Sequence, residues 1–468
     1  MERLSPPELI ILRVEDRGLP MHVAALIIFD GAVRAGLADS GRAGLAGPRD
    51  LARPASLLDL DTLRVIVAQR LHLAPRLRQV LYRPGLGLGP PVWVDAAGFD
   101  IREHVRARPV PAPGDEAALL RVCAELNQDR LDRSRPLWQM WLLTGLADHR
   151  AGLLVRLHHV VADGIAALAM LGALCDPDPG TAAADVPAWA PEAVPSGREL
   201  AADQLHRQAL AVTGAVRALR RPSAGAARFG VLARQAGQLA ADGVAPRTSL
   251  NVPVSGHHRL LLVRADLERA RAVAHAHGGT VNDVVLAAVA GGARSVLAAR
   301  GELTPRLVLR ASVAASVRAA PDPRATGNRV GIILVPLPVA EADPARRLAQ
   351  IAAVTAARKR QPPYAGPNTS LLQRPMISMM SRQRMVNLLV SNLPGPASPL
   401  CLAGARIREM YQIGIVQGNV TVSVGALSYA GQLNIAVVGD PEAIPDLAVV
   451  AAGMADTLEQ LGAAVTQS

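Results

Sequence analysis

Two adjacent histidines, His158 and His159, are the residues of this sequence best suited to chemistry. They follow a largely apolar run at 152–157, which is typical of a strand. Asp163 and Gly164 come shortly afterwards and lead into an apolar segment at 165–174 that predicts a helix. The histidines therefore lie at a predicted strand-to-helix turn, a place where a rigid frame commonly holds functional side chains.

Neighbouring residues of an extended chain point to opposite sides, so one histidine should face a cleft and the other the interior. A neutral histidine in a cleft is a good general base, because its ordinary pKa of ~6.5 lies close to the working pH. Asp163 has two compatible roles: it could fix the geometry around the base, and it could cap the following helix. No carboxylate or histidine at metal-ligand spacing accompanies the pair, so we expect no metal.

Composition and charge exclude several classes of protein. The chain has 468 residues, which suggests two or three domains, and half of them are hydrophobic. The net charge is +11, and nearly all of the positive charge is carried by arginine, because Lys359 is the single lysine. Arginine is spread thinly and aromatic residues make up 2% of the chain, so we expect no nucleic acid as a partner. The lysine lies between two arginines, so there is no phosphate-binding loop of the Gly-Lys-Ser/Thr type.

The cysteines and the termini give further expectations. Cys123, Cys175 and Cys401 are far apart and odd in number, which favours buried free thiols over a disulfide framework. The first residues carry no secretory apolar segment, and the long uncharged run between Glu409 and Asp440 has the glycines and amides of a buried sheet. The mean hydropathy of +0.22 is compatible with contact at a membrane surface.

The elements that must position the histidines are predicted next. Apolar runs at 137–146 and 152–157 are separated by a short turn and indicate a hairpin. Residues 31–56 are typical of a loop insertion, and residues 176–199 hold five prolines, which predicts a linker. Residues 200–241 have a helical composition with several arginines, either as a solvated face or as a membrane contact. We therefore expect an N-terminal lobe over 1–175, a linker and helical crossover over 176–249, and a C-terminal lobe over 250–468.

The order of several short motifs resembles the bacterial bifunctional wax ester synthase/diacylglycerol acyltransferase family. The histidines, Asp163 and Gly164 match the HHxxxDG motif of CoA-dependent acyltransferases, which fixes only the superfamily. The narrower resemblance rests on further blocks in the expected order: 4–6, 20–23, 135–138 (Arg-Pro-Leu-Trp), 250–259, 282–287 (Asn-Asp-Val-Val-Leu-Ala), 316–318, 327–328, 337–338, 391–396 (Ser-Asn-Leu-Pro-Gly-Pro) and 428–433. Together they extend over nearly the whole chain.

This resemblance implies an α/β fold like that of chloramphenicol acetyltransferase, with two lobes and a tunnel between them. It implies that acyl-CoA and an acceptor alcohol meet at His159, the general base, with His158 and Asp163 completing the catalytic motif. The acyl group would pass directly to the alcohol without an acyl-enzyme, in keeping with the absence of a Gly-x-Ser-x-Gly nucleophile motif. Acyl-CoA is then a substrate, and no cofactor or metal is expected.

The resemblance also suggests residues that line the substrate site. These candidates are Gly164, Asn282, Ser391, Asn392, Pro394 and Gly395. Asn282 fits two roles about equally, a polar group beside the reacting oxyanion and a cap of the helix that follows it. Asp163 is expected to turn away from substrate and pair with an arginine, for which Arg318 is the candidate.

The implied reaction makes triacylglycerol from diacylglycerol and a long-chain acyl-CoA, with fatty alcohols giving wax esters as a related activity. Such substrates imply a cytoplasmic protein associated peripherally with the inner membrane or with lipid droplets. Two alternatives remain: a condensation-type acyltransferase that uses carrier-protein thioesters, and a non-catalytic lipid-binding paralogue. The 282–287 and 391–396 blocks argue against the first, and the intact histidine motif argues against the second.

Overall fold

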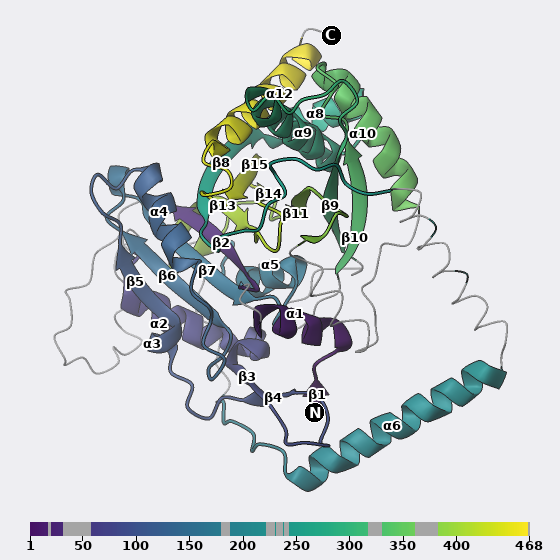
Figure 1. Cartoon of the computed structure of the whole chain (residues 1–468). Coiled ribbons are helices and arrows are strands. Elements are labelled where there is room, and N and C mark those ends of the chain that lie inside the picture. Colours follow the sequence, from purple (N-terminus) through teal and green to yellow (C-terminus); the bar gives the residue numbers. More distant parts are fainter. Residues whose placement is uncertain are drawn as a thin grey trace.

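A computed structural model describes residues 1–16, 20–30, 58–178, 188–220, 243–316, 330–360 and 382–466, together with residues 230 and 237. Two six-stranded mixed sheets lie beside each other, with a smaller three-stranded sheet near the N-terminus (Figure 1). The loop insertion expected at 31–56 lies outside the described residues. The α/β class and the two sheets agree with the expected two-lobed architecture.

The first sheet carries the histidine motif. Its strands, in spatial order, are β12 (Cys401–Leu402), β13 (Ala405–Ile413), β2 (His22–Phe29), β7 (Ala151–His158), β6 (Trp138–Thr144) and β5 (Val105–Pro109). Strands β6 and β7 form the predicted antiparallel hairpin. Alternation along β2 sends Leu26 and Ile28 to one face of the sheet and Ile27 and Phe29 to the other, and both faces are buried.

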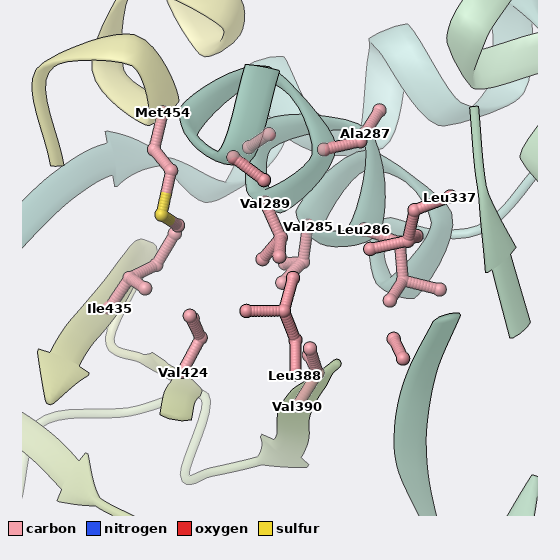
Figure 2. Packing of buried hydrophobic residues seen from close by; sticks show 14 of the residues in the cluster. Val285, Leu286, Ala287, Val289, Leu337, Leu388, Val390, Val424, Ile435 and Met454 are labelled. Carbon is pink, nitrogen blue, oxygen red and sulfur yellow. The ribbon is translucent and has the colours of Figure 1, made fainter. Parts of the chain in front are cut away.

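The second sheet lies under a layer of helices. Its strands, in spatial order, are β10 (Val330–Leu337), β9 (Leu309–Ser316), β11 (Leu388–Pro394), β14 (Val422–Tyr429), β15 (Gln432–Gly439) and β8 (Arg259–Asp266). The covering helices are α8 (Leu267–Ala276), α9 (Val281–Ala299), α10 (Pro344–Lys359) and α12 (Leu447–Thr466). Figure 2 shows Val285 and Val289 of α9 above Leu388, Val390 and Val424 of the sheet. Small and branched side chains build this core, as the scarcity of aromatic residues requires.

Helix α9 is the one helix of the described residues that is long and apolar enough to cross a membrane. Within that apolar stretch, 72% is buried inside the protein. The helix is hydrophobic on nearly all sides because it is enclosed between the sheet, α10 and α12. Its composition is therefore that of a core helix.

The remaining elements complete the first half of the chain. The helices are α1 (Pro6–Asp16), α2 (Leu60–Arg70), α3 (Ile101–His104), α4 (Glu116–Leu126), α5 (Gly164–Ala173) and α6 (Gly197–Arg220), and the small sheet has the order β1 (Glu2–Arg3), β4 (Val92–Asp95), β3 (Gln79–Tyr82). Side chains of α2 and α5 pack in the core on one face of the first sheet, and those of α4 pack on the other. Helix α6 begins beside the small sheet and extends away from both large sheets (Figure 1).

Strand β13 joins the two halves of the chain. It lies at 405–413, in the second half of the sequence, yet it pairs antiparallel with β2 in the first sheet, from Phe29 opposite Ile407 to Ala24 opposite Ile413. It also packs against β14 and β15 of the second sheet. The expected division into 1–175 and 250–468 describes the sequence order of the halves, while the first sheet draws two of its six strands from the second half.

Candidate active site

The turn after β7 separates the two histidine side chains. His158 is the last residue of β7 and lies opposite His22 of β2. The backbone N–H of His159 donates a hydrogen bond of 2.9 Å to the carbonyl of Met21, so the extended pairing continues through it. His158 is fully buried, whereas His159 is partly exposed. The opposite orientation expected for the two rings follows from this alternation.

His158 is held in one tautomer. Its Nδ1 accepts a hydrogen bond of 3.1 Å from the backbone N–H of Val160, so the proton of the neutral ring is on Nε2. That Nε2 lies 3.2 Å from Oε2 of Glu15 on α1. Both side chains are buried, and the guanidinium of Arg133 forms an ion pair with Oε2 of Glu15. His158 is therefore a buried support beneath the turn, with Nδ1 hydrogen-bonded to the backbone and Nε2 at ion-pair distance from Glu15.

Glu15 keeps its negative charge although it is buried. Burial raises the pKa of its carboxyl, but the contacts with His158 and Arg133 outweigh burial and lower that pKa to about 2. The sequence contained a signal for this residue, because Glu8, Ile11, Leu12 and Glu15 recur at helical spacing and are all buried on one face of α1. An acidic residue on the buried face of a helix needs a partner, and here the partner is the histidine motif.

His159 is neutral at physiological pH. Burial is the largest cause, and with the neighbouring His158 it lowers the pKa of the imidazole to about 4, against an opposing effect of Asp163. A neutral ring has one nitrogen free of a proton, which is what a general base requires. Val155 and Leu157 point to the same side of β7 as His159, by strand alternation, and they line an apolar cavity. The alternation therefore directs His159 toward the cavity side of β7.

Asp163 caps the helix that follows the motif. It is buried, and its Oδ1 accepts a hydrogen bond of 3.0 Å from the backbone N–H of Ala166 in the first turn of α5. The capping role expected from the sequence is confirmed. Arg318, the candidate partner of Asp163, lies outside the described residues.

The 391–396 block meets the histidine motif at Gly164. A Cβ built on Gly164 would lie 3.0 Å from Cδ1 of Leu393, which belongs to β11 in the second sheet. The histidine motif and the 391–396 block, more than 200 residues apart in sequence, are therefore in direct contact. Gly164 has no room for a side chain unless Leu393 moves, so its contribution is the close approach of α5 to β11.

The remaining residues of the 391–396 block lie at the end of β11. Ser391, Asn392 and Pro394 belong to the strand, which pairs parallel with β14. Gly395 follows, and a Cβ there would lie 2.2 Å from the carbonyl oxygen of Ser428. Gly395 is thus required by the backbone packing between β11 and β14, while Ser391 reaches toward β13.

An apolar cavity lies between the first sheet and α5. Its walls come from α5, β2, β6, β7, β11, β13 and β14, and its lining includes Val23, Trp138, Leu157, Gly164, Leu168, Leu171, Leu393 and Gln412. His159 is not among the lining residues, although its neighbours Leu157 and Gly164 are. A cavity lined in this way suits a hydrocarbon chain.

Gln412 is a polar exception in the cavity lining. Its Nε2 donates a hydrogen bond of 2.9 Å to Oγ of Ser391, so the amide bridges β13 and β11. The Oε1 atom of the same amide is buried and has no hydrogen-bond partner within the described part of the chain. Sequence reasoning selected Ser391 but missed Gln412, because the pairing depends on a strand from the second half entering the first sheet.

Asn282 is placed differently from the other candidates. It lies in the first turn of α9, half-buried, and is absent from the cavity lining. The expectation that it caps this helix is wrong, because the helix begins one residue earlier and Thr280 with Asp283 forms the cap. Hydroxyls of Thr280 and Thr355 also bind Asp283, so the polar start of α9 is satisfied by residues other than Asn282.

Among the described residues, no group of three or more histidine, cysteine, aspartate or glutamate side chains is arranged to hold a metal ion. The three cysteines are free thiols, and burial raises the pKa of Cys123 and Cys175 to about 12. Such thiols stay protonated and are poor nucleophiles. The reactive group offered by this geometry is therefore the neutral His159.

Two mixed sheets that meet at the histidine turn are the arrangement implied by the resemblance to HHxxxDG acyltransferases. Family models place the chain within this class. The wax ester synthase/diacylglycerol acyltransferase catalytic domain matches residues 4–285, and the C-terminal domain of the same proteins matches residues 326–462. The chain belongs to the wax ester synthase/diacylglycerol acyltransferase family, and it is an acyltransferase.

Individual relatives agree with this assignment. The probable diacylglycerol O-acyltransferase tgs1 of Mycobacterium tuberculosis is 33% identical over 86% of this chain and 88% of its own. The probable diacylglycerol O-acyltransferase tgs2 of the same organism is 29% identical over 99% of this chain and 100% of its own.

Solved structures agree on the fold. The wax ester synthase/diacylglycerol acyltransferase from Marinobacter aquaeolei VT8 superimposes with a TM-score of 0.67 at 24% identity, with full coverage of both chains. The first condensation domain of the CDA synthetase superimposes with a TM-score of 0.61 at 16% identity over 98% of this chain and 95% of its own. At these identities the likeness is one of fold.

Proposed function

We propose that this chain transfers a long-chain acyl group from acyl-CoA to the free hydroxyl of diacylglycerol, and that long-chain alcohols serve as a second class of acceptor. The observation that carries the proposal is the position of His159, a neutral imidazole that directly follows β7, between Leu157 and Gly164, which line an apolar cavity. Hydrocarbon chains fit such walls, and a neutral imidazole is the base that the transfer requires.

In the proposed reaction His159 takes the proton from the acceptor hydroxyl while the oxygen attacks the thioester carbonyl. The tetrahedral intermediate collapses, the carbon–sulfur bond breaks, and the imidazolium returns the proton to the CoA thiolate. Ester and free CoA are the products, and no cofactor enters the balance. His158, fixed by Glu15 and the Val160 amide, acts as a positioning residue for the turn that carries His159.

The proposal is tested with purified protein and palmitoyl-CoA, by following release of free CoA thiol. The acceptor panel is dioleoylglycerol, hexadecanol and a short soluble alcohol, with His159→Ala as the matched inactive variant. We expect thiol release that depends on both His159 and an acceptor, with ester recovered in equal amount. A rate that His159→Ala leaves within a few-fold of the parent would overturn the role of this base.

A condensation-type reaction on carrier-protein thioesters is the second candidate, favoured by the shared fold with condensation domains. Activity on free acyl-CoA without a carrier protein separates the two. We also propose that the protein works in the cytoplasm, at the surface of the inner membrane or of lipid droplets, because diacylglycerol and long-chain alcohols partition into such phases.

A further inference from the structure

The α6 helix is a large exposed element that the proposed reaction does not use. It spans Gly197–Arg220, and 24 residues give a rod of about 36 Å. Figure 1 shows it leaving the small sheet and extending away from both lobes. A helix without tertiary contacts is marginally stable in water, so an exposed helix of this length points to a surface that it contacts.

Among the described residues, the contacts between the body and α6 involve the first part of the helix. Leu200 is buried against Val92 and Val94 of the small sheet. Arg3 donates hydrogen bonds of 2.5 Å from Nε to the Asp203 carboxylate and of 2.9 Å from Nη2 to the Leu200 carbonyl. These contacts fix the direction in which the rest of the helix projects.

Beyond this anchor the helix presents an apolar stripe to solvent. Leu205, Ala209, Val212 and Val216 are spaced by four, three and four residues, so they share one face. Leu205 is 66% exposed, Val212 63% and Val216 41%. Leu200 and Asp203, which hold the body, lie on the opposite side of the helix, because each residue turns the chain by ~100°. The stripe therefore faces away from the protein.

The charge of this segment is of one sign. Positions 204–241 hold six arginines and no aspartate or glutamate. Within the described part of the segment, Arg207 and Arg217 are exposed. Arg207, which pairs with Asp203 at 3.1 Å, and Arg217 lie on the polar side of the helix, away from the stripe. A helix with one apolar face and a cationic polar face matches an anionic lipid surface, where the apolar face enters the headgroup region.

We propose that α6 is the membrane-contact element of this acyltransferase, lying in the surface of an anionic bilayer or lipid monolayer with Leu205, Ala209, Val212 and Val216 inserted. The partner of this helix face is lipid. Its insertion holds both lobes close to the lipid phase that supplies diacylglycerol. The inference rests on the proposed function only for the link to diacylglycerol supply, because lipid binding by the helix requires no catalytic activity.

The test is flotation of the full-length protein with vesicles of phosphatidylcholine alone and of phosphatidylcholine with phosphatidylglycerol. The variant replaces Leu205, Val212 and Val216 together by Gln, which suits a helix. The matched control is Leu210→Gln, since Leu210 is 58% exposed but lies off the stripe. We expect roughly tenfold weaker binding to the anionic vesicles for the triple variant and no change for the control. Arg217→Gln should weaken binding about fivefold at low salt.

Equal binding by the parent and the triple variant would overturn the proposal, as would parent binding that does not depend on phosphatidylglycerol. A parent that is a dimer in solution and a triple variant that is a monomer would also overturn it, because the stripe would then be covered by a second copy. Thiol release with the short soluble alcohol should be the same in all variants. If the parent shows no thiol release with any acceptor, the proposed reaction fails while the lipid-binding result stands.

Discussion

At the scale of residues, the site depends on the different surroundings of two neighbouring imidazoles. His158 is buried, with Nδ1 bound to the Val160 amide and Nε2 near Glu15, whereas His159 lies on the cavity side with a lowered pKa. The turn geometry follows from local hydrogen bonds, and the electrostatics follow from a carboxylate on a helix far away in sequence. Each of these contributions can be removed separately.

Replacement of His159 by Ala should lower kcat by about 10²–10⁴, the usual loss when a general base is removed. The circular dichroism spectrum and unfolding midpoint should stay close to those of the parent, because the ring is partly exposed. Steady-state thiol release measures the first and thermal unfolding the second. A loss of activity that tracks a loss of folded protein would contradict the catalytic role.

The pH profile should reflect the lowered pKa of His159. With a pKa of about 4, the ring remains neutral well below the ordinary value of 6.5, so kcat/KM should fall only as the pH approaches 4. The unfolded chain binds a proton between pH 6.5 and 4 while the folded ring does not, so stability should decrease as the pH falls through this window. An acidic limb centred near 6.5 in the pH dependence of thiol release would contradict this prediction.

Glu15→Gln should lower both stability and kcat. The amide keeps an acceptor for His158 but removes the charge that pairs with Arg133, and we expect a loss of ~1–2 kcal/mol in urea unfolding. The lowered pKa of Glu15 stabilises the fold above pH ~4.5 and is lost toward pH 2, so the difference between parent and variant should shrink in acid. Asp16→Asn is the control, because Asp16 also pairs with Arg133 but is half exposed.

At the scale of elements, the site is assembled where the start of α5 meets the end of β11. The contact of Gly164 with Leu393 and the amide bridge from Gln412 to Ser391 are the two links that bring the second half of the chain to the histidine motif. The first link depends on the close approach that glycine at 164 allows, and Gly395 allows a separate close approach of β11 to the Ser428 carbonyl.

Gly164→Ala should reduce activity more than stability, because the new methyl group displaces the flexible Leu393 side chain beside the cavity. Leu393→Ala in the same chain should restore part of the activity, and a double-mutant cycle measures the coupling. Gly395→Ala meets the Ser428 carbonyl instead, which cannot move aside, so we expect a loss of ~2 kcal/mol or more in stability. Additive effects of the 164 and 393 substitutions would contradict the contact.

At the scale of the whole molecule, the two halves of the chain are joined by β13. Its pairing with β2 means that the first sheet is incomplete without the second half of the chain, and its packing on β14 and β15 ties that sheet to the second one. Arg264 on β8 adds ion pairs to Glu116 on α4 and Glu409 on β13, so the connection is polar as well as apolar. This arrangement holds the cavity between elements from both halves.

Residues 1–249 alone should not yield a soluble folded monomer. Removal of β13 leaves the hydrogen-bonding edge of β2 unpaired and uncovers an apolar face, which favours aggregation. Size-exclusion chromatography and circular dichroism of this fragment test the prediction, with the full chain as reference. A monomeric fragment with a cooperative unfolding transition would show that the first lobe is independent.

The sequence by itself determined what depends on near neighbours. Alternation and apolar runs predicted the hairpin of β6 and β7 and the opposite orientation of the two histidines, and Asp163 was recognised as a helix cap. These features need only a few residues on either side, and local backbone geometry settles them. The ordered motifs indicated the family, because their residue types and spacing can be read along the chain.

Tertiary structure alone decided the rest. It brought together three pairs of residues that are far apart in the sequence: Glu15 with His158, Leu393 with Gly164, and Gln412 with Ser391. Their separations range from 21 residues to more than 200. It also showed that Thr280 caps α9 and that β13 pairs within the first sheet. Such contacts form because burial of apolar faces selects one packing of the elements, and the partner of a buried polar group is known only after that packing is fixed.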